Sequence, residues 1–442
     1  MRQSIRFVSA VLAILWTVPP GSAAPPDEAA AEMVAATPAP DWPEFHGPQR
    51  DAIATDTGLL GEWSADGPAL VWQISGLGLG YSTVSIADGK IFTMGDRPDG
   101  QGGDSQFALA FDLETREELW ATPIGPPHTD GPRSTPTYDD GAVYVLGTSG
   151  DLVALDAGDG NTLWRRNLPE DFDGQMMSRW HFSESPLIDG SRLICTPGGP
   201  EATIVALDKK TGRTLWQSAM PPIGEAGRDG AGYSSAVVAE IAGVRQYVQM
   251  LGRGVIGVDA ETGRFLWGYN RIANRVANIT RPVVRGDYVF ATTSYKTGSA
   301  LLRIHRDGDE FSAEEIYFLG PEDFENHHGG VVLIGDYIYG GDGQNSGHPV
   351  CLDFATGEIQ WKTRAPAAGS AAVLYADGHV IFRYDRGRVA LIEATPDDFH
   401  LKGTFEPVRG EGPAWAHPVI HQGKLYLRHG DVLACYDLRP TE

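Results

Sequence analysis

Short runs of alternating apolar and polar residues, separated by tight-turn residues, fill most of the 442-residue chain. In STPTYDDGAVYVLG (134–147), two runs with a period of two flank an Asp-Gly pair. Such alternation predicts half-buried β-strands, and Asp-Gly predicts the tight turn of a hairpin. Two more such runs follow directly, in GDLVALD (150–156) and NTLW (161–164). We therefore predict a unit of four short strands.

This four-strand unit recurs along the chain. The phrase VALDKKTGRTLW (205–216) returns as ALDAGDGNTLW, GVDAETGRFLW and CLDFATGEIQW. Its aspartate and glycine suit a turn, and its tryptophan suits an interface between neighbouring sheets. Such units predict a β-propeller, because four-stranded sheets pack radially with little exposed edge. The closing aromatic occurs eight times: Trp72, Trp120, Trp164, Trp216, Trp267, Tyr317, Trp361 and Phe405.

Both ends of the repeat region carry an incomplete unit. Trp72 closes a strand that lacks three strands before it, and residues 415–437 supply three strands without a closing aromatic. We therefore predict that the two ends complete one blade. The predicted fold class is all-β: an eight-bladed β-propeller of four-stranded antiparallel blades, closed by an N-terminal strand that joins the C-terminal blade.

The Asp-x-x-Thr-Gly-x-x-x-Trp hairpin at this period resembles the pyrroloquinoline-quinone (PQQ) repeat. The resemblance covers residues 68–437, nearly the whole repeat region. The family's eight-bladed propellers include quinoprotein alcohol dehydrogenases and the outer-membrane-protein assembly propeller. The preceding DWPEFHGPQRD (41–51) is similar to an element found before such propellers in secreted bacterial proteins. The resemblance identifies a fold, and a fold alone does not give a function.

The N-terminal residues predict export. Arg2 and Arg6 precede an apolar run too short to span a membrane, and small residues follow, so we expect a signal peptide over residues 1–23, cleaved near Ala23. No cysteine follows the apolar run, which disfavours a lipid anchor. Export places the protein in the periplasm or outside the cell. The other expected parts are a disordered leader (24–40), an N-terminal extension packing on the propeller (41–67) and the propeller itself (68–440).

Charge and cysteine content exclude several classes of partner. The formal net charge is −23, with acidic residues spread along the chain, which disfavours nucleic acid as a partner. No second stretch is apolar enough to enter a bilayer. Cys195, Cys351 and Cys435 are scattered among apolar residues and are expected to be buried. We expect a monomer, since a closed ring needs no partner for stability.

The units differ most at the start of the innermost strand, which in a propeller lines the central channel near one face. The first unit reads GYSTVS and the eighth AWAHPV, whereas the seventh, AGSAAV, has only small residues. Aromatic, imidazole and guanidinium groups that converge on one mouth would form a polar pocket with stackable walls. The alternative is that these loop residues only satisfy backbone carbonyls and cover the channel. The candidate ligand- or partner-binding residues are Tyr81, Arg133, Trp180, His181, Glu184, Tyr233, Arg275, Asn278, Arg281, His327, His328, Trp415 and His417.

The function we favour is a non-catalytic, exported binding or scaffold propeller with this site at the channel mouth. Its partner is expected to be a protein or a small anionic organic ligand, because Arg133, Arg275 and Arg281 would make the mouth positive within an acidic protein. Recognition of a carbohydrate or polymer is a further possibility. We predict no metal site, since no close-spaced metal motif occurs, and we assign no catalytic residue.

The alternative is a PQQ-dependent dehydrogenase that oxidises an alcohol or a sugar. The resemblance implies that such enzymes usually carry a vicinal disulfide and a calcium ion, whereas no two cysteines are adjacent here. In this alternative Trp180 or Trp415 would stack on the quinone, and the arginines would pair with its carboxylates. Glu184 would act as a base or calcium ligand, with Asn278 beside it.

Overall fold

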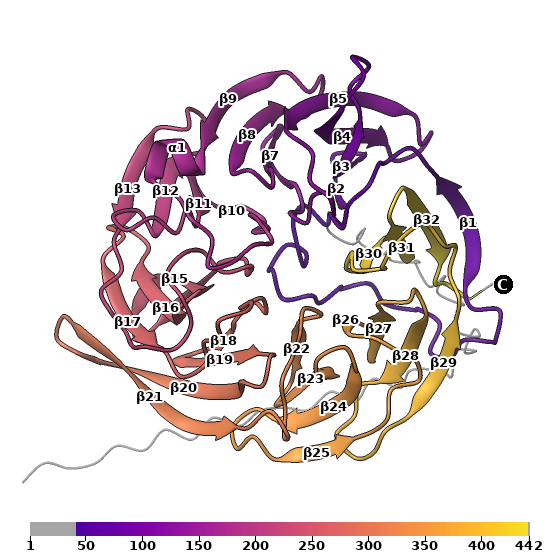
Figure 1. The fold of residues 1–442 in the computed structure, drawn as a ribbon. Helices are drawn as coiled ribbons and strands as arrows, with labels where there is room; N and C mark the ends of the chain where they lie inside the picture. The colour runs from indigo at the N-terminus through magenta and orange to yellow at the C-terminus, as the bar shows by residue number, and fades with distance from the viewer. Residues whose placement is uncertain (1–40, 441–442) are drawn as a thin grey trace, which may run out of the picture. The chain divides into compact units, whose positions relative to one another are not determined.

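A computed structural model describes residues 41–440, so the expected signal peptide (1–23) and leader (24–40) lie outside the described residues. The described chain forms eight four-stranded antiparallel sheets in a ring (Figure 1). The fold class predicted from the sequence is confirmed. Within residues 41–440 there is one short helix, α1 (Leu168–Phe172), and no helix is long and apolar enough to cross a membrane.

Each of the first four blades is built from four consecutive strands, and the strands follow one another in chain order from the channel to the rim. Blade 1 comprises β2 (Ser85–Ala87), β3 (Lys90–Pro98), β4 (Asp104–Asp112) and β5 (Glu118–Gly125). Blade 2 comprises β6 (Thr137–Asp139), β7 (Ala142–Leu146), β8 (Asp151–Asp156) and β9 (Thr162–Asn167). Blade 3 comprises β10 (Leu187–Asp189), β11 (Arg192–Cys195), β12 (Ile204–Asp208) and β13 (Thr214–Ser218). Blade 4 comprises β14 (Val237–Ile241), β15 (Val244–Leu251), β16 (Gly254–Asp259) and β17 (Phe265–Tyr269).

The next three blades repeat this order, and the eighth combines both ends of the described chain. Blade 5 comprises β18 (Val283–Arg285), β19 (Tyr288–Thr293), β20 (Gly298–Asp307) and β21 (Glu310–Leu319). Blade 6 comprises β22 (Val331–Ile334), β23 (Tyr337–Asp342), β24 (His348–Asp353) and β25 (Ile359–Lys362). Blade 7 comprises β26 (Ala371–Ala376), β27 (His379–Tyr384), β28 (Val389–Glu393) and β29 (Leu401–Phe405). Blade 8 comprises β30 (Val419–His421), β31 (Lys424–His429), β32 (Val432–Asp437) and β1 (Ala69–Ile74).

The ring closes where the sequence predicts. Strand β1 pairs antiparallel with β32, with Ala69 opposite Asp437 and Ile74 opposite Leu433. The outer strand of blade 8 therefore comes from the start of the repeat region, and its three inner strands come from the end. This pairing joins segments more than 350 residues apart and completes blade 8 (Figure 1).

The repeated phrase builds the contact between neighbouring blades. Asp208 accepts hydrogen bonds from the backbone N–H groups of Lys210 (3.1 Å) and Thr211 (2.9 Å), which fixes the turn. Gly212 follows with φ +67°, and a Cβ there would lie 2.7 Å from the ring of Trp164 in blade 2. Trp164 donates its indole N–H to the Lys209 carbonyl at 2.8 Å. The motif thus combines an aspartate that sets the turn with a glycine that leaves room for the preceding blade's tryptophan.

Buried arginines hold the junction where the ring closes. Arg428 of blade 8 donates to the carbonyls of Ser82 (3.0 Å) and Gly78 (3.1 Å) in the segment that leads into blade 1. Arg383 of blade 7 donates to the Ala416 carbonyl (2.7 Å) and to that of Arg428. Both side chains are buried. Burial lowers the pKa of each guanidinium to about 9, so both remain charged at neutral pH.

Residues 41–56, which we name the strap, cross the middle of the ring (Figure 1). Trp42 exchanges two backbone hydrogen bonds with Ile86 of blade 1, both 2.8 Å long. At the other end, Ile53 forms a parallel bridge with Tyr375 of blade 7. Residues 57–67 continue along blades 7 and 8, where the Leu60 N–H donates to the Leu438 carbonyl at 2.7 Å. The strap therefore links blade 1 to blade 7, the two blades that flank blade 8 in the ring.

Candidate functional site

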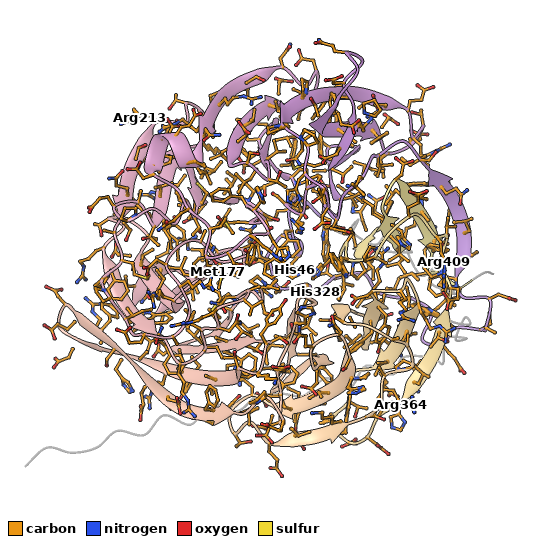
Figure 2. The ribbon with its side chains drawn as sticks, viewed as in Figure 1. His46, Met177, Arg213, His328, Arg364 and Arg409 are labelled. Carbon is orange, nitrogen blue, oxygen red and sulfur yellow. The ribbon has the colours of Figure 1, made fainter. Side chains whose placement is uncertain are left out.

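A cavity of about 550 Å³ lies in the central channel. Its lining comes from the strap and from seven of the eight blades. Blade 7 adds no lining residue among residues 41–440, as expected from the small side chains at its inner start. Figure 2 shows His46 and His328 near the middle of the ring, in contrast to Arg213 at its rim. Nine of the thirteen candidate residues line the cavity: Tyr81, Arg133, Trp180, Tyr233, Arg281, His327, His328, Trp415 and His417.

The lining residues follow the period of an extended chain. Positions two apart line the cavity in successive blades, as in the pairs 81/83, 133/135, 183/185 and 233/235. Successive side chains of an extended chain point to opposite sides, so every second residue faces the channel. His327 and His328 break this rule, because the chain bends at residues 328–329 and both side chains line the cavity. Adjacent residues also line it at Ile279, Thr280 and Arg281.

Aromatic rings form much of the wall. The rings of Tyr81 and Trp415 lie 4.6 Å apart, and those of Trp180 and Tyr233 meet edge to face at 5.9 Å. His328 adds an edge contact to Trp415 at 5.5 Å. Such walls suit a flat apolar ligand, because aromatic rings favour offset stacked or edge-to-face contacts.

Three arginines give the cavity positive charge. Arg133 pairs with Asp130 at 2.7 Å, and exposed Arg179 lies over the Trp180 ring at 5.2 Å. Arg281 is only 8 % exposed, and burial lowers its pKa to about 10, so it is still a cation at neutral pH. Its Nη1 donates to the Pro282 carbonyl at 3.0 Å. Within residues 41–440, Arg281 forms no direct ion pair, although the Asp51 carboxylate is near enough to stabilise its charge. Its Nη2 makes no hydrogen bond with these residues, so one donor nitrogen remains for a ligand.

Two histidines continue from Arg281 in a chain of hydrogen bonds. Arg281 Nε lies 3.3 Å from His46 Nδ1, His46 Nε2 lies 2.9 Å from His417 Nδ1, and His417 Nε2 lies 3.2 Å from the His328 carbonyl. Because a guanidinium can only donate, His46 Nδ1 accepts and each following Nε2 donates. Burial lowers the pKa of His46 well below its usual value and that of His417 to about 4. Both rings are therefore neutral at pH 7, in a single tautomer.

A second histidine chain lies beside the first, because the rings of His327 and His328 are 4.5 Å apart. His327 Nε2 is 2.9 Å from the Tyr295 hydroxyl, and its Nδ1 is 2.8 Å from the Ser370 hydroxyl. Burial lowers the pKa of His327 to about 4, so this ring is also neutral at pH 7. His328 lies 3.4 Å from Asp385, whose pKa burial raises to about 6. Asp385 thus titrates near pH 6 beside His328, although it does not line the cavity.

Four candidate residues do not line the cavity. Glu184 is buried and accepts hydrogen bonds from the Thr196 N–H (2.7 Å) and from Gln249 Nε2 (2.9 Å). Asn278 is also buried, and its amide bonds to the backbone of Asn274 and Leu251. Arg275 and His181 are exposed, and the His181 ring lies 4.5 Å from that of His128.

The sequence prediction missed two sources of lining residues, which are the strap and the turn between β19 and β20. Phe45 and His46 line the cavity from the strap, and Tyr295 lines it from the turn after β19. The sequence prediction covers only the starts of the inner strands and the residues just before them, such as Trp180 and Arg275. The signal that was present is the aromatic-histidine pair in DWPEFHGPQRD, since two such residues are unusual in a plain linker.

The cavity lining suits the quinone of a PQQ enzyme but does not suit the calcium ion that accompanies it. Its aromatic and guanidinium groups suit a flat ring bearing carboxylates. Calcium needs several oxygen ligands, but among residues 41–440 no group of three or more His, Cys, Asp or Glu is placed to hold a metal. Glu184 and Asn278, which the resemblance suggested for that role, use their polar atoms elsewhere. The residues present do not fit the calcium ion.

Comparison with curated proteins gives three informative relatives. BamB of Shewanella oneidensis is 21 % identical over 60 % of this chain, and BamB of Xanthomonas campestris pv. campestris is 31 % identical over 34 %. The quinoprotein alcohol dehydrogenase PedH of Pseudomonas putida is 24 % identical over 66 %. The matched regions span 63 %, 32 % and 42 % of these relatives, respectively.

Solved structures share the fold at low identity. BamB from Moraxella catarrhalis superposes with a TM-score of 0.58 at 15 % identity, covering 84 % of this chain and 98 % of that one. Quinohemoprotein alcohol dehydrogenase from Comamonas testosteroni gives a TM-score of 0.61 at 14 % identity, covering 91 % and 81 %. A PQQ-repeat family model described as "Outer membrane protein assembly factor BamB" matches residues 104–363 and 327–396, more than half of the chain. The chain therefore belongs to this BamB family of PQQ-repeat propellers.

Proposed function

We propose that the protein is an exported, non-catalytic binding propeller whose central cavity holds a ligand with a carboxylate and a flat apolar part. The observation that carries the proposal is Arg281, a buried cation that lines the cavity with one donor nitrogen unused. A buried charge without a direct ion pair is unfavourable, and a bound carboxylate would offset that penalty. Guanidinium is also the side chain best shaped to bind a carboxylate.

The surrounding groups support binding rather than catalysis. His46 and His417 are neutral, and each uses both of its ring nitrogens in hydrogen bonds within the protein. Asp130 is already paired with Arg133. A general base needs an accessible acceptor in reach of the substrate, and these groups are committed elsewhere. The cavity is therefore better suited to holding a ligand than to moving its protons.

The relatives favour a scaffold role in the cell envelope. Three of the curated proteins matched are named outer membrane protein assembly factors. By analogy with that name, we place this protein outside the cytoplasm as a monomer that engages a protein partner, with the cavity as its ligand site. The analogy rests on a shared family, and family membership alone fixes no partner.

Loss of one charge tests the cavity's role. Isothermal titration of the purified exported protein with naphthalene-2,6-dicarboxylate is expected to show saturable binding, and the neutral dimethyl ester is expected to bind at least tenfold more weakly. Arg281→Gln should weaken dicarboxylate binding at least tenfold, because it removes the anchoring charge. Arg275→Gln is the matched control, since Arg275 is exposed and lies off the cavity lining. The proposal would be contradicted if Arg281→Gln bound the dicarboxylate as tightly as the wild type does. It would also be contradicted if the wild type bound the ester as tightly as the dicarboxylate.

The alternative, a PQQ-dependent dehydrogenase, is favoured by the match to PedH and by the aromatic and guanidinium groups that line the cavity. The two functions are distinguished by adding PQQ with calcium to the protein, followed by an alcohol or a sugar and an electron-accepting dye. The proposed function expects no dye reduction. Sustained, substrate-dependent reduction would replace the binding function with the dehydrogenase.

A further inference from the structure

We infer that the strap is part of the binding site and that His46 is a positioning residue, which holds Arg281 in the orientation that receives the ligand's carboxylate. This inference rests on the proposed function, because it assigns a second element to the same cavity. It concerns residues that precede the repeat region and belong to none of the eight blades.

The strap is anchored independently of His46. Arg50 is buried and donates from Nη2 to the Ser185 carbonyl at 2.7 Å and from Nη1 to the Ala236 carbonyl at 3.2 Å. Its Nε pairs with Glu44 of the strap at 3.1 Å. These bonds attach the strap to blades 3 and 4, so its path across the channel does not depend on the cavity-lining histidine.

The backbone of the strap is strained at His46 and at two residues that follow it. His46, Arg50 and Ala52 all have positive φ, at 67°, 53° and 61°, although none is glycine. Side chains other than glycine rarely adopt this left-handed conformation, and it persists only where the surroundings enforce it. Three such residues within seven positions indicate a segment whose backbone is held in place by its contacts with the blades.

His46 provides a hydrogen-bond acceptor for Arg281. Its Nδ1 accepts from Arg281 Nε, and its Nε2 is fixed by donation to His417 Nδ1. The ring is further held by stacking on Phe45, with centroids 3.8 Å apart. With Nε bound to His46 and Nη1 bound to Pro282, the guanidinium plane is fixed and Nη2 is the nitrogen left for the ligand. A pre-oriented guanidinium loses less freedom on binding than a mobile one.

A matched pair of amides tests the inference. In His46→Asn the side-chain oxygen reaches the place of Nδ1, and asparagine tolerates positive φ, so naphthalene-2,6-dicarboxylate binding should stay within about threefold of wild type. In His46→Gln the amide reaches the place of Nε2 instead and leaves Arg281 Nε without its acceptor, so binding should weaken about tenfold. His181→Ala is the control for a left-handed histidine outside the cavity, with φ +63°, and should bind as wild type does.

A readout without ligand makes the test independent of affinity. The NMR signal of the Arg281 Nε–H proton is assigned by its loss in Arg281→Gln. This proton should exchange slowly with water in the wild type and in His46→Asn, and fast in His46→Gln. Equal affinities and equal exchange in the two amide variants would overturn the inference. If Arg281→Gln abolishes binding while His46→Gln does not, only the inference fails. If the wild type does not bind the dicarboxylate at all, the proposed function fails.

Discussion

The outer rim and the central channel of this ring are built on opposite plans. At the rim, five pairs of neighbouring blades meet through the same arrangement: a glycine turn of one blade packs under the aromatic side chain of the blade before it, as Gly212 under Trp164 and Gly263 under Trp216. In the channel, blades contribute side chains as different as Tyr81, Arg281 and His327 to one cavity. Repetition serves a contact that each blade makes separately, and diversity serves a site that all blades share.

The outer strands also carry a common irregularity. Seven of them shift register by one residue just before the closing aromatic, as between Ala206 and Leu207 opposite β13. In β29 the shift comes just before Gly403 instead of Phe405. The residue skipped in this way is an exposed leucine in blades 1 to 3, where Leu163 is 52 % exposed. A bulge at a sheet edge interrupts the row of free backbone groups that another chain could pair with. The rim is thus shaped for contact with adjacent blades and against pairing with other molecules.

Removal of the ring closure should have the largest effect. A chain that ends at residue 410 lacks β30, β31 and β32, so β1 has no partner and blade 8 is lost. We expect no cooperative thermal transition by circular dichroism and an aggregated or unfolded product, because every blade depends on packing against two neighbours. A soluble monomer that melts cooperatively would contradict the closure.

Removal of one rim aromatic should have the next largest effect. Trp164→Ala empties the space between blades 2 and 3, and a Trp-to-Ala change at a buried site lowers the free energy of unfolding by about 3–5 kcal/mol. The neighbouring Leu163→Ala should change it by only about 0.5 kcal/mol, since Leu163 is exposed. Urea denaturation followed by tryptophan fluorescence measures both. Similar losses in the two variants would show that the bulge residue, too, stabilises the ring.

A buried acid next to the channel should give a smaller effect that depends on pH. Burial raises the pKa of Glu184 from its usual 4.5 to about 7, so the folded protein binds this proton more tightly than the unfolded chain does. Its contribution to stability is complete below pH 4.5 and is lost as the pH rises through 7. The full change is of the order of 3 kcal/mol.

Urea denaturation of the wild type and Glu184→Gln at pH 4.5 and pH 8 isolates this proton. The wild type should lose stability relative to the variant as the pH rises, because the amide cannot ionise. Glu117→Gln serves as the control, since Glu117 is exposed. A constant difference between wild type and Glu184→Gln across this pH range would mean that Glu184 ionises in the folded protein as it does in water.

The comparison of rim and channel also explains what the sequence could reveal. The strands, the eight blades and their closure follow from Trp72, Asp208 and the other repeated residues, because each signal occurs several times and each copy has the same neighbours. The channel residues Tyr81, Arg133 and Trp415 were found because they depart from that pattern.

Two kinds of channel information were out of reach or overlooked. The partnership of His46 with His417 spans 371 residues and leaves no local trace in the sequence. Glu184, by contrast, was placed among the candidates although its neighbours Ser183 and Ser185 line the cavity and it does not. The period of two along an extended chain predicts that side chains at alternate positions point away from the channel.

The glycine turn that receives an aromatic ring has a consequence for how such a ring can change. Each blade offers unlike surfaces to its two neighbours, so the blades are joined head to tail, in the manner of subunits in a cyclic oligomer whose members share one polypeptide. Such a circle closes only if the rotation at each step is one eighth of a turn. Gain or loss of a single unit during evolution would therefore require every remaining step to adopt a new angle.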